Sequence, residues 1–346
     1  MQKTDKVRNS SIDIFRLPCA ILVICIHTFP FEDINPVLET IISEHIGRIA
    51  VPFFFATIGF YFVKRLLEGK EVKSTFLRLL RIYLLWSAIT IIVEIIARVV
   101  SGNFNLLNFT LEYLLNFFVI GTKYQLWFFP ALFLALGFLT LCNKLKILEY
   151  MVYLPFVFYV LGLLGGIYYK LGNEIPVITN IVNFAHFYKG IHRIFGIGLP
   201  FVTLGYFLNK FYEKHKKNNL LYILILALIT ILFFVESYLA VKFSLCVNVK
   251  TSIFLYPLIF LIMVLLIDNP SKNEKTIKWS ATSRDISNFM YYSHPFFIDI
   301  LRVVDLFIIT IPNFKIASFA ITLILTFTIG FVIHKENKKY YNFFIK

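Results

Sequence analysis

Charged residues are scarce in this 346-residue sequence: Asp, Glu, Lys and Arg make up 16% of it, whereas soluble domains carry about a quarter. Apolar residues make up 58%, and the mean hydropathy is +0.76. So little charge excludes an ordinary soluble domain and predicts a polytopic membrane protein. The formal net charge of +14 therefore indicates membrane topology, and we expect no nucleic-acid partner.

The sequence also lacks the motifs of several common chemistries. Its four cysteines form no CxxC pair and mostly lie in apolar runs, so we interpret them as core residues and expect no metal or redox centre. No GxSxG, HExxH, P-loop or GxGxxG stretch occurs in the structural context that it requires. Covalent serine catalysis and nucleotide hydrolysis are thus disfavoured. The loops are short and leave no room for a soluble catalytic domain.

Apolar runs that are long enough, or nearly so, to cross a membrane fill most of the sequence, given that a spanning helix takes about 20 residues. Ten such runs predict an all-α fold, a single transmembrane bundle of about ten helices over residues 1–346. The runs fall at about 12–30, 46–64, 78–98, 125–142, 148–168, 191–209, 220–241, 251–268, 285–302 and 314–334.

The distribution of Lys and Arg predicts that both termini are cytoplasmic. With this orientation the inner segments contain 23 Lys and Arg residues and the outer segments ten, in agreement with the positive-inside rule. We expect a cytoplasmic tail at 1–11 and a basic cytoplasmic tail at 335–346 that can lie against anionic lipid of the bilayer. No cleavable signal peptide is expected, because the first apolar run contains Asp13 and Arg16 and no A-x-A site.

The first apolar run contains Asp13 and Arg16 at one end and His27 near the other. An ionisable side chain in hydrocarbon costs about 2.5–3.5 kcal/mol even on a lenient scale, so each needs a reason. Arg16 and His27 are eleven residues apart, which places them on one helix face about 16 Å apart. Histidine suits general base catalysis, and arginine can hold a phosphate or carboxylate in a bidentate contact. Alternatively, Asp13 and Arg16 form a surface pair and His27 is a satisfied polar residue at the outer interface.

Two further groups stand at the ends of predicted spans. Arg78 and Arg81 begin the third run, where they suit a cytoplasmic clamp for a phosphate-bearing substrate. Positive-inside anchoring alone also explains them. Tyr124, Gln125 and Trp127 begin the fourth run at its outer end, either as an ordinary aromatic belt or as the substrate-binding surface of an outward cavity.

Other notable residues lie inside the apolar runs. His294 precedes Pro295, which removes a backbone hydrogen bond and frees a carbonyl group. Glu94 and Glu236 stand alone in their runs, and we expect them to point into the bundle toward a polar cavity or a partner. Gly59 in the second run favours a close approach of two helix backbones.

Five short motifs in a fixed order connect this sequence with a known family. They are Arg-x10-His (Arg16, His27), PFFF followed by GF (52–60), Arg-x-x-Arg (Arg78, Arg81), LWF (126–128) and YYSHP (291–295). Together they resemble the membrane-bound acyltransferase family 3, multi-pass O-acyltransferases that modify lipopolysaccharide, peptidoglycan, capsule and other glycans. Where many members have Ser-Gly, this chain has Ile58-Gly59 after Thr57. With that segment, IHT and WFFPA, it looks most like the membrane domain of the serine/alanine racemases of vancomycin-resistance clusters.

The resemblance implies an enzyme that transfers an acyl group, in particular acetyl, from cytoplasmic acyl-CoA (acetyl-CoA) without a metal. It implies that His27 is the base or transient acyl carrier, that Arg16 is its partner beside Asp13, and that Arg78 and Arg81 contact the donor. The acceptor would be a hydroxyl of an extracytoplasmic glycan or another cell-envelope molecule at a bacterial plasma membrane. We assign substrate binding to Tyr124, Gln125, Trp127, Glu94, Glu236 and His294.

A second hypothesis gives the same residues a transport function. The membrane domain of the serine racemases is associated with amino-acid uptake, so the cavity would pass L-serine or a similar small amino acid. Arg16 would then meet the carboxylate, and Glu94 or Glu236 the amine. Intramembrane ionisable residues serve both functions, and a purely structural or regulatory membrane module is a third possibility. No racemase domain follows in this sequence, which leaves open both a stand-alone protein and a domain of a longer one.

Overall fold

The computed structural model describes residues 9–336 except 101, 103 and 188–191, and this part of the chain contains helices and no strand. The main helices are α1 (Ser10–Thr28), α3 (Ala50–Leu67), α4 (Lys73–Val100), α5 (Leu106–Leu115), α6 (Phe128–Lys144), α8 (Leu154–Leu164), α10 (Pro176–Phe187), α12 (Leu199–Lys214), α13 (Asn219–Lys242), α14 (Leu255–Asp268), α15 (Glu274–Phe307) and α16 (Phe314–Glu336). Shorter helical pieces are α2 (Pro36–Glu39), η1 (Thr40–His45), η2 (Ile46–Ile49), η3 (Asn116–Ile120), α7 (Leu148–Met151), α9 (Tyr169–Asn173) and η4 (Ile194–Gly198).

The all-α prediction is confirmed for the described residues, and each of the ten predicted spans overlaps one of the main helices. Six helical segments are long and apolar enough to cross a membrane, and four shorter apolar helices accompany them. The count of ten spans and the cytoplasmic position of the termini stay predictions. Most of the predicted tails, residues 1–8 and 337–346, lies outside the described residues.

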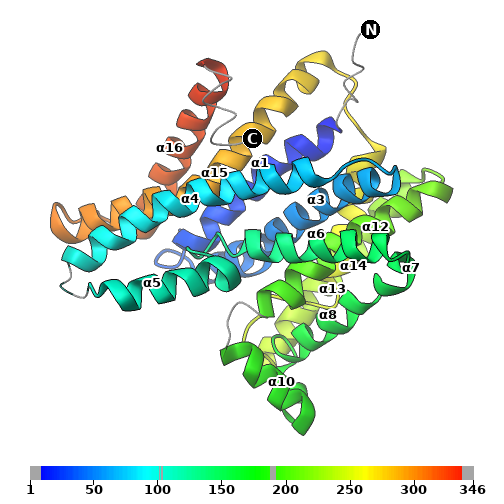
Figure 1. The fold of residues 1–346 in the computed structure, drawn as a ribbon, viewed down its shortest axis with the longest axis horizontal. Coiled ribbons are helices and arrows are strands. Elements are labelled where there is room, and N and C mark those ends of the chain that lie inside the picture. The colour runs from blue at the N-terminus through cyan, green and yellow to red at the C-terminus, as the bar shows by residue number, and fades with distance from the viewer. Residues whose placement is uncertain (1–8, 101, 103, 188–191, 337–346) are drawn as a thin grey trace.

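Helix α1 occupies the centre of one half of the bundle. It packs most extensively against α15 and also contacts α3, α14 and α16, while α15 pairs with α16 and α3 pairs with α12 (Figure 1). Its apolar side chains Ile12, Ala20 and Ile24 are fully buried in these contacts. A helix surrounded by neighbours can keep polar side chains away from lipid, and this placement makes the ionisable residues of α1 tolerable.

The pairing of α3 with α12 depends on two glycines. A Cβ on Gly59 would lie 2.1 Å from the carbonyl oxygen of Val202, and a Cβ on Gly205 would lie 2.2 Å from the carbonyl carbon of Gly59. Small residues at such a crossing let two backbones touch, which gains van der Waals contact where lipid supplies no hydrophobic drive. The expected close approach at Gly59 is confirmed.

We expect Gly59→Ala to lower the midpoint of thermal unfolding of the purified protein. The added methyl group must push α12 away, and overpacking of this kind costs about 1–3 kcal/mol. Gly137→Ala on α6 is the matched control, since no atom lies within 4 Å of a Cβ at that position. Equal midpoints for the two variants, measured by differential scanning fluorimetry, would contradict the tight crossing.

Candidate functional site

Helix α1 places Arg16 and His27 in two separate cavities. Asn9 begins the helix: its side-chain oxygen accepts hydrogen bonds from the backbone N–H groups of Ser11 and Ile12, at 3.0 and 3.1 Å. Arg16, near the N-terminal end, lines one cavity, and His27, one residue before the C-terminal end, lines the other. The two residues predicted to act as a pair therefore lie in two different cavities at opposite ends of one helix.

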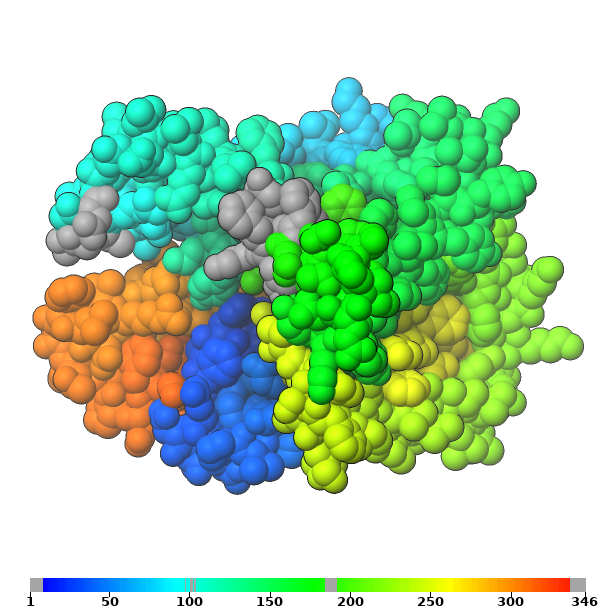
Figure 2. All heavy atoms as spheres, turned by 90° about the horizontal axis from the view of Figure 1, so that it is seen from below, coloured from blue at the N-terminus to red at the C-terminus, as the bar shows by residue number. Residues whose placement is uncertain are grey.

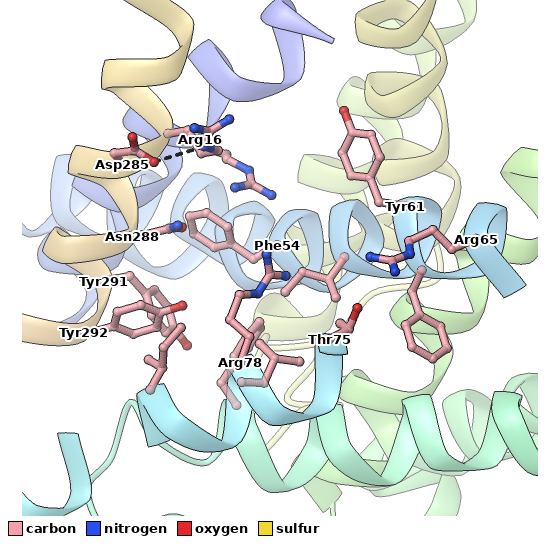
Figure 3. A pocket seen from close by; sticks show the side chains of 16 residues that line it. Arg16, Phe54, Tyr61, Arg65, Thr75, Arg78, Asp285, Asn288, Tyr291 and Tyr292 are labelled. Atoms are coloured by element: carbon pink, nitrogen blue, oxygen red, sulfur yellow. Dashed lines mark hydrogen bonds and ion pairs between the residues drawn. The ribbon is translucent and has the colours of Figure 1, made fainter. Parts of the chain in front are cut away.

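The first cavity, which we call the arginine cavity, has a volume of about 260 Å³. Figure 3 shows its side chains converging from α1, α3, α4 and α15. Its charged lining consists of four cations and one carboxylate, namely Arg16, Arg65, Arg78, Arg284 and Asp285. Thr75, Asn288 and the rings of Phe54, Tyr61, Phe62, Phe128, Tyr291 and Tyr292 complete the polar and aromatic lining. This excess of positive charge suits a ligand with several anionic groups, because a guanidinium forms charge-assisted hydrogen bonds with phosphate oxygens.

Two buried carboxylates hold the cations of α1 and α15 in place. Asp13 lies 3.8 Å from Arg16 Nε and 3.4 Å from an Arg284 terminal nitrogen. Asp285 accepts a hydrogen bond from Arg284 Nε at 3.0 Å and lies 3.2 Å from His334 Nδ1 on α16. Asp13 is 1% exposed and does not line either cavity. The structure thus places Asp13 as an orienting partner of two arginines rather than as a group that faces a substrate.

The two arginines predicted to act together on α4 occupy different positions. Arg78 lines the arginine cavity, whereas Arg81 is solvent-exposed and does not line it. Sequence reasoning missed Arg65 and Arg284 because both lie in segments where positive-inside anchoring already explained them. The short Ser-Arg-Asp segment at the start of the ninth apolar run was a usable signal for Arg284, since its charges interrupt a helix that otherwise becomes apolar.

The second cavity, which we call the histidine cavity, has a volume of about 660 Å³. Its polar and aromatic lining comprises His27, Phe29, Glu44, Arg48, Tyr124, Gln125, Trp127, His192, Arg193, Asn248, Lys250 and Tyr291. Two of the segments that supply these residues are the segment before α3 and the loop between α13 and α14. They are drawn in blue and yellow in the space-filling view of Figure 2. Tyr124, Gln125 and Trp127, predicted to bind substrate, all lie in this cavity with His27.

His27 stacks against a second histidine. The rings of His27 and His294 are 5.3 Å apart with an interplanar angle of 19°, and the ring of Tyr124 lies 4.5 Å from His27. Nδ1 of His294 lies 3.0 Å from the Met290 carbonyl oxygen, so this nitrogen carries the proton and Nε2 is an acceptor. Within the described residues, His294 Nε2 and the Tyr124 hydroxyl are buried and have no hydrogen-bond partner. Buried polar groups without partners concentrate at functional sites.

Tyr291 lines both cavities. Its ring centroid lies 5.4 Å from those of Phe54 and Phe128, and its hydroxyl donates to the Gln125 carbonyl oxygen at 3.3 Å. Gln125 Nε2 in turn donates to the carbonyl oxygen of Tyr292 at 3.4 Å. We call the three rings of Phe54, Phe128 and Tyr291 the aromatic layer; the two phenylalanine rings contact that of Tyr291 where the linings of the two cavities meet.

The two intramembrane glutamates, which were predicted to contact substrate, line neither of these two cavities. Glu94 on α4 has a side chain that is 40% exposed and pairs with Arg98, at 3.0 Å. Its partner lies one turn away on the same helix, so the charge is satisfied without turning inward.

Glu236 is buried but serves the backbone of the loop between α13 and α14. It accepts hydrogen bonds from the Tyr168 hydroxyl at 2.7 Å, from the Ile253 N–H at 2.9 Å, and from the Ser252 hydroxyl. A carboxylate just before the N-terminus of α14 also complements the helix dipole. The structure therefore shows Glu236 stabilising this loop, and its contact with substrate stays a prediction.

Comparison with known families agrees with this architecture. The model of acyltransferase family 3, described as an acyltransferase domain, matches residues 9–335. The chain therefore belongs to this family, and with its six span-length apolar helices it is a helical membrane protein. The resemblance inferred from the five motifs is confirmed.

The curated relatives include two racemases that the chain matches over nearly its whole length. It is 28% identical over 335 residues to an amino-acid racemase from Enterococcus faecalis and 27% identical over 335 residues to a serine/alanine racemase from Enterococcus gallinarum. Each match covers 94% of this chain but 46% of the relative. The chain thus spans about half the length of these relatives. No solved structure matches it.

Proposed function

We propose that the chain is a membrane-bound O-acyltransferase that moves an acyl group from cytoplasmic acyl-CoA to a hydroxyl on the other side of the membrane. The acceptor oxygen attacks the thioester carbonyl, the new ester bond forms, and the carbon–sulfur bond breaks. His27 takes the hydroxyl proton, and the sulfur leaves as the thiolate of coenzyme A, which is protonated to the thiol. General base catalysis of this kind contributes about 10²–10⁴-fold to a rate.

The observation that carries this proposal is the pair of cavities that meet at Tyr291. The arginine cavity offers four guanidinium groups at the end of α1 predicted to be cytoplasmic, where a donor rich in phosphate would bind. The histidine cavity offers His27, a base with buried polar neighbours, on the other side of Tyr291. In the proposed reaction the thioester end of the donor reaches past the aromatic layer, and its carbonyl carbon stays bonded to sulfur until the acceptor oxygen attacks it. Acetyl is the acyl group to test first, and a cell-envelope glycan is the acceptor class that family membership favours.

Passage of a small amino acid is a second candidate, because the curated relatives are named amino-acid and serine/alanine racemases. Arg16 suits a carboxylate in this reading as well. However, Glu94 and Glu236, which were expected to meet the ammonium group, line neither cavity, and Glu44 in the histidine cavity is already paired with Arg48. The arrangement of charges therefore supports the acyltransferase better.

Calorimetric titration of the detergent-solubilised protein separates the two functions. We expect acetyl-CoA to bind and L-serine to bind much more weakly, if at all, because only acetyl-CoA carries the phosphates that four arginines can contact. Coenzyme A alone should retain most of the affinity, since it carries the same phosphates. Binding of L-serine without acetyl-CoA would overturn the proposed function in favour of transport.

A further inference from the structure

The histidine cavity contains more positive charge than its own residues neutralise. Arg48, Arg193 and Lys250 line it. Among the described residues, Glu44 is the one carboxylate in the lining. Glu44 pairs with Arg48 one turn away on the helix. In the described residues, Arg193 and Lys250 form no ion pair with a carboxylate. Two cationic groups thus face this cavity without a protein counter-charge.

These cations come from three separate segments and are held close to one another. Arg48 lies on η2, Arg193 directly precedes η4, and Lys250 lies in the loop between α13 and α14. The guanidinium of Arg193 lies over the ring of Trp127, 5.7 Å from its centroid, in a cation–π contact. Burial lowers the pKa of the Lys250 ammonium, and the positive charges of Arg48 and Arg193 lower it further, against the opposing effect of Glu44. This repulsion agrees with the position of all three residues in the lining of one cavity.

Arg193 is half-buried, whereas Lys250 is solvent-exposed, so the cost of a cation without an anionic partner falls mainly on Arg193. Removing a charge from water without a partner costs several kcal/mol, and a concave site lined by charges of one sign concentrates ligands of the opposite sign. The volume of about 660 Å³ lies within the range of small-molecule sites, about 300–1,000 Å³. The aromatic faces of Trp127 and Tyr124 in the same lining suit the apolar face of a ring-shaped ligand.

We propose that the histidine cavity binds an acceptor that carries a carboxylate or a phosphate group, held by Arg193 and Lys250 with Arg48 beside them. Bound in this way, a polyhydroxylated molecule such as an acidic sugar or a phosphorylated polyol has a hydroxyl within the space that His27 lines. The role of that hydroxyl as acyl acceptor rests on the proposed function. The anion site itself rests only on the charges of the cavity.

Two matched pairs of probes test the charge requirement and separate the two anion chemistries. Methyl β-D-glucuronide and methyl β-D-glucoside differ in a carboxylate, and sn-glycerol 3-phosphate and glycerol differ in a phosphate. When the probes are titrated into the solubilised protein, at least one anion should bind tenfold or more tightly than its neutral counterpart, and added salt should weaken that binding. Comparison of the two anions identifies the chemistry: tighter binding of the glucuronide indicates a carboxylate site, and tighter binding of glycerol 3-phosphate indicates a phosphate site. Equal binding of charged and neutral probes, or no anion binding at millimolar concentrations, would overturn the proposal.

Variants place the bound anion in this cavity. Arg193→Gln and Lys250→Gln should each reduce anion affinity about tenfold, and Lys250→Arg should restore much of it. Lys242→Gln is the control: this lysine ends α13, adjacent to the same loop, and does not line the cavity. Loss of binding in Lys242→Gln equal to that in Lys250→Gln would place the anion elsewhere and overturn the assignment.

Acetyl-CoA binding, measured on the same preparations, keeps the two proposals apart. Anion binding that depends on Lys250, with no binding of acetyl-CoA, would remove the acyltransferase proposal and leave the anion site standing. Binding of acetyl-CoA with no preference for a charged probe would remove the anion site and leave the acyltransferase. The midpoint of thermal unfolding of each variant shows that its fold is retained.

Discussion

His27→Ala is expected to reduce acyl transfer by about 10²–10⁴-fold, the range that a positioned general base contributes. The side chain lies in the histidine cavity, stacked on His294 and in ring contact with Tyr124. No carboxylate of the described lining replaces it as a base, because Glu44 is paired with Arg48. Release of the coenzyme A thiol from acetyl-CoA, measured with a thiol reagent in the presence of an acceptor, gives the rate.

A second substitution separates proton transfer from simple packing. His27→Gln keeps a polar side chain of similar size that cannot take a proton near neutral pH, so it should be as inactive as alanine. Acetyl-CoA affinity should be unchanged in both variants, since the arginine cavity lies beyond the aromatic layer. Turnover by either variant within a few-fold of the unsubstituted protein would remove His27 from the mechanism.

Arg78→Gln is expected to weaken acetyl-CoA binding about tenfold, whereas Arg81→Gln should change it little. A hydrogen bond to a charged group contributes about 1.5–3 kcal/mol. Arg78 is solvent-exposed, so we expect a contribution near the lower end of that range. A loss of about 1.4 kcal/mol weakens binding tenfold. The two variants remove the same charge from the same helix, but only Arg78 lines the arginine cavity.

Calorimetry of both variants at two salt concentrations distinguishes a contact from a general field. A long-range effect of charge weakens both variants alike and fades as salt screens it. A direct contact affects Arg78→Gln alone at both salt concentrations. Equal weakening of the two variants would place the donor elsewhere on the cytoplasmic surface.

The helical class and the shared face of Arg16 and His27 could be predicted because they depend on local periodicity. A separation of eleven residues fixes the angle between two side chains on any helix, and an apolar run fixes where a helix can cross a membrane. Periodicity does not say what faces each end of α1. That Arg16 and His27 occupy different cavities depends on α3 and α15, whose packing the sequence does not reveal.

The contacts between distant segments were beyond sequence reasoning for the same reason. Arg65 and Arg284 reach the arginine cavity from α3 and α15, whereas Arg193 reaches the histidine cavity from the helical residues before η4 and Lys250 from the loop between α13 and α14. In the sequence, all four counted only toward topology. Glu236 shows the converse. As an isolated acidic residue in an apolar run it was predicted to contact substrate, but in the structure it accepts hydrogen bonds from backbone N–H groups of a neighbouring loop, which the sequence did not place beside it.

The aromatic layer of Phe54, Phe128 and Tyr291 has an electrical consequence for the proposed reaction. If water enters both cavities, most of the membrane potential falls across this thin layer. The thioester end of the donor crosses it without carrying a free charge, yet the reaction leaves a proton on His27 and a thiolate that returns to the opposite side. A proton returned through the layer keeps each turnover electroneutral. A proton released outward moves one elementary charge against an inside-negative potential, at about 2.3 kcal/mol per 100 mV, and the turnover rate of such an enzyme would depend on the membrane voltage.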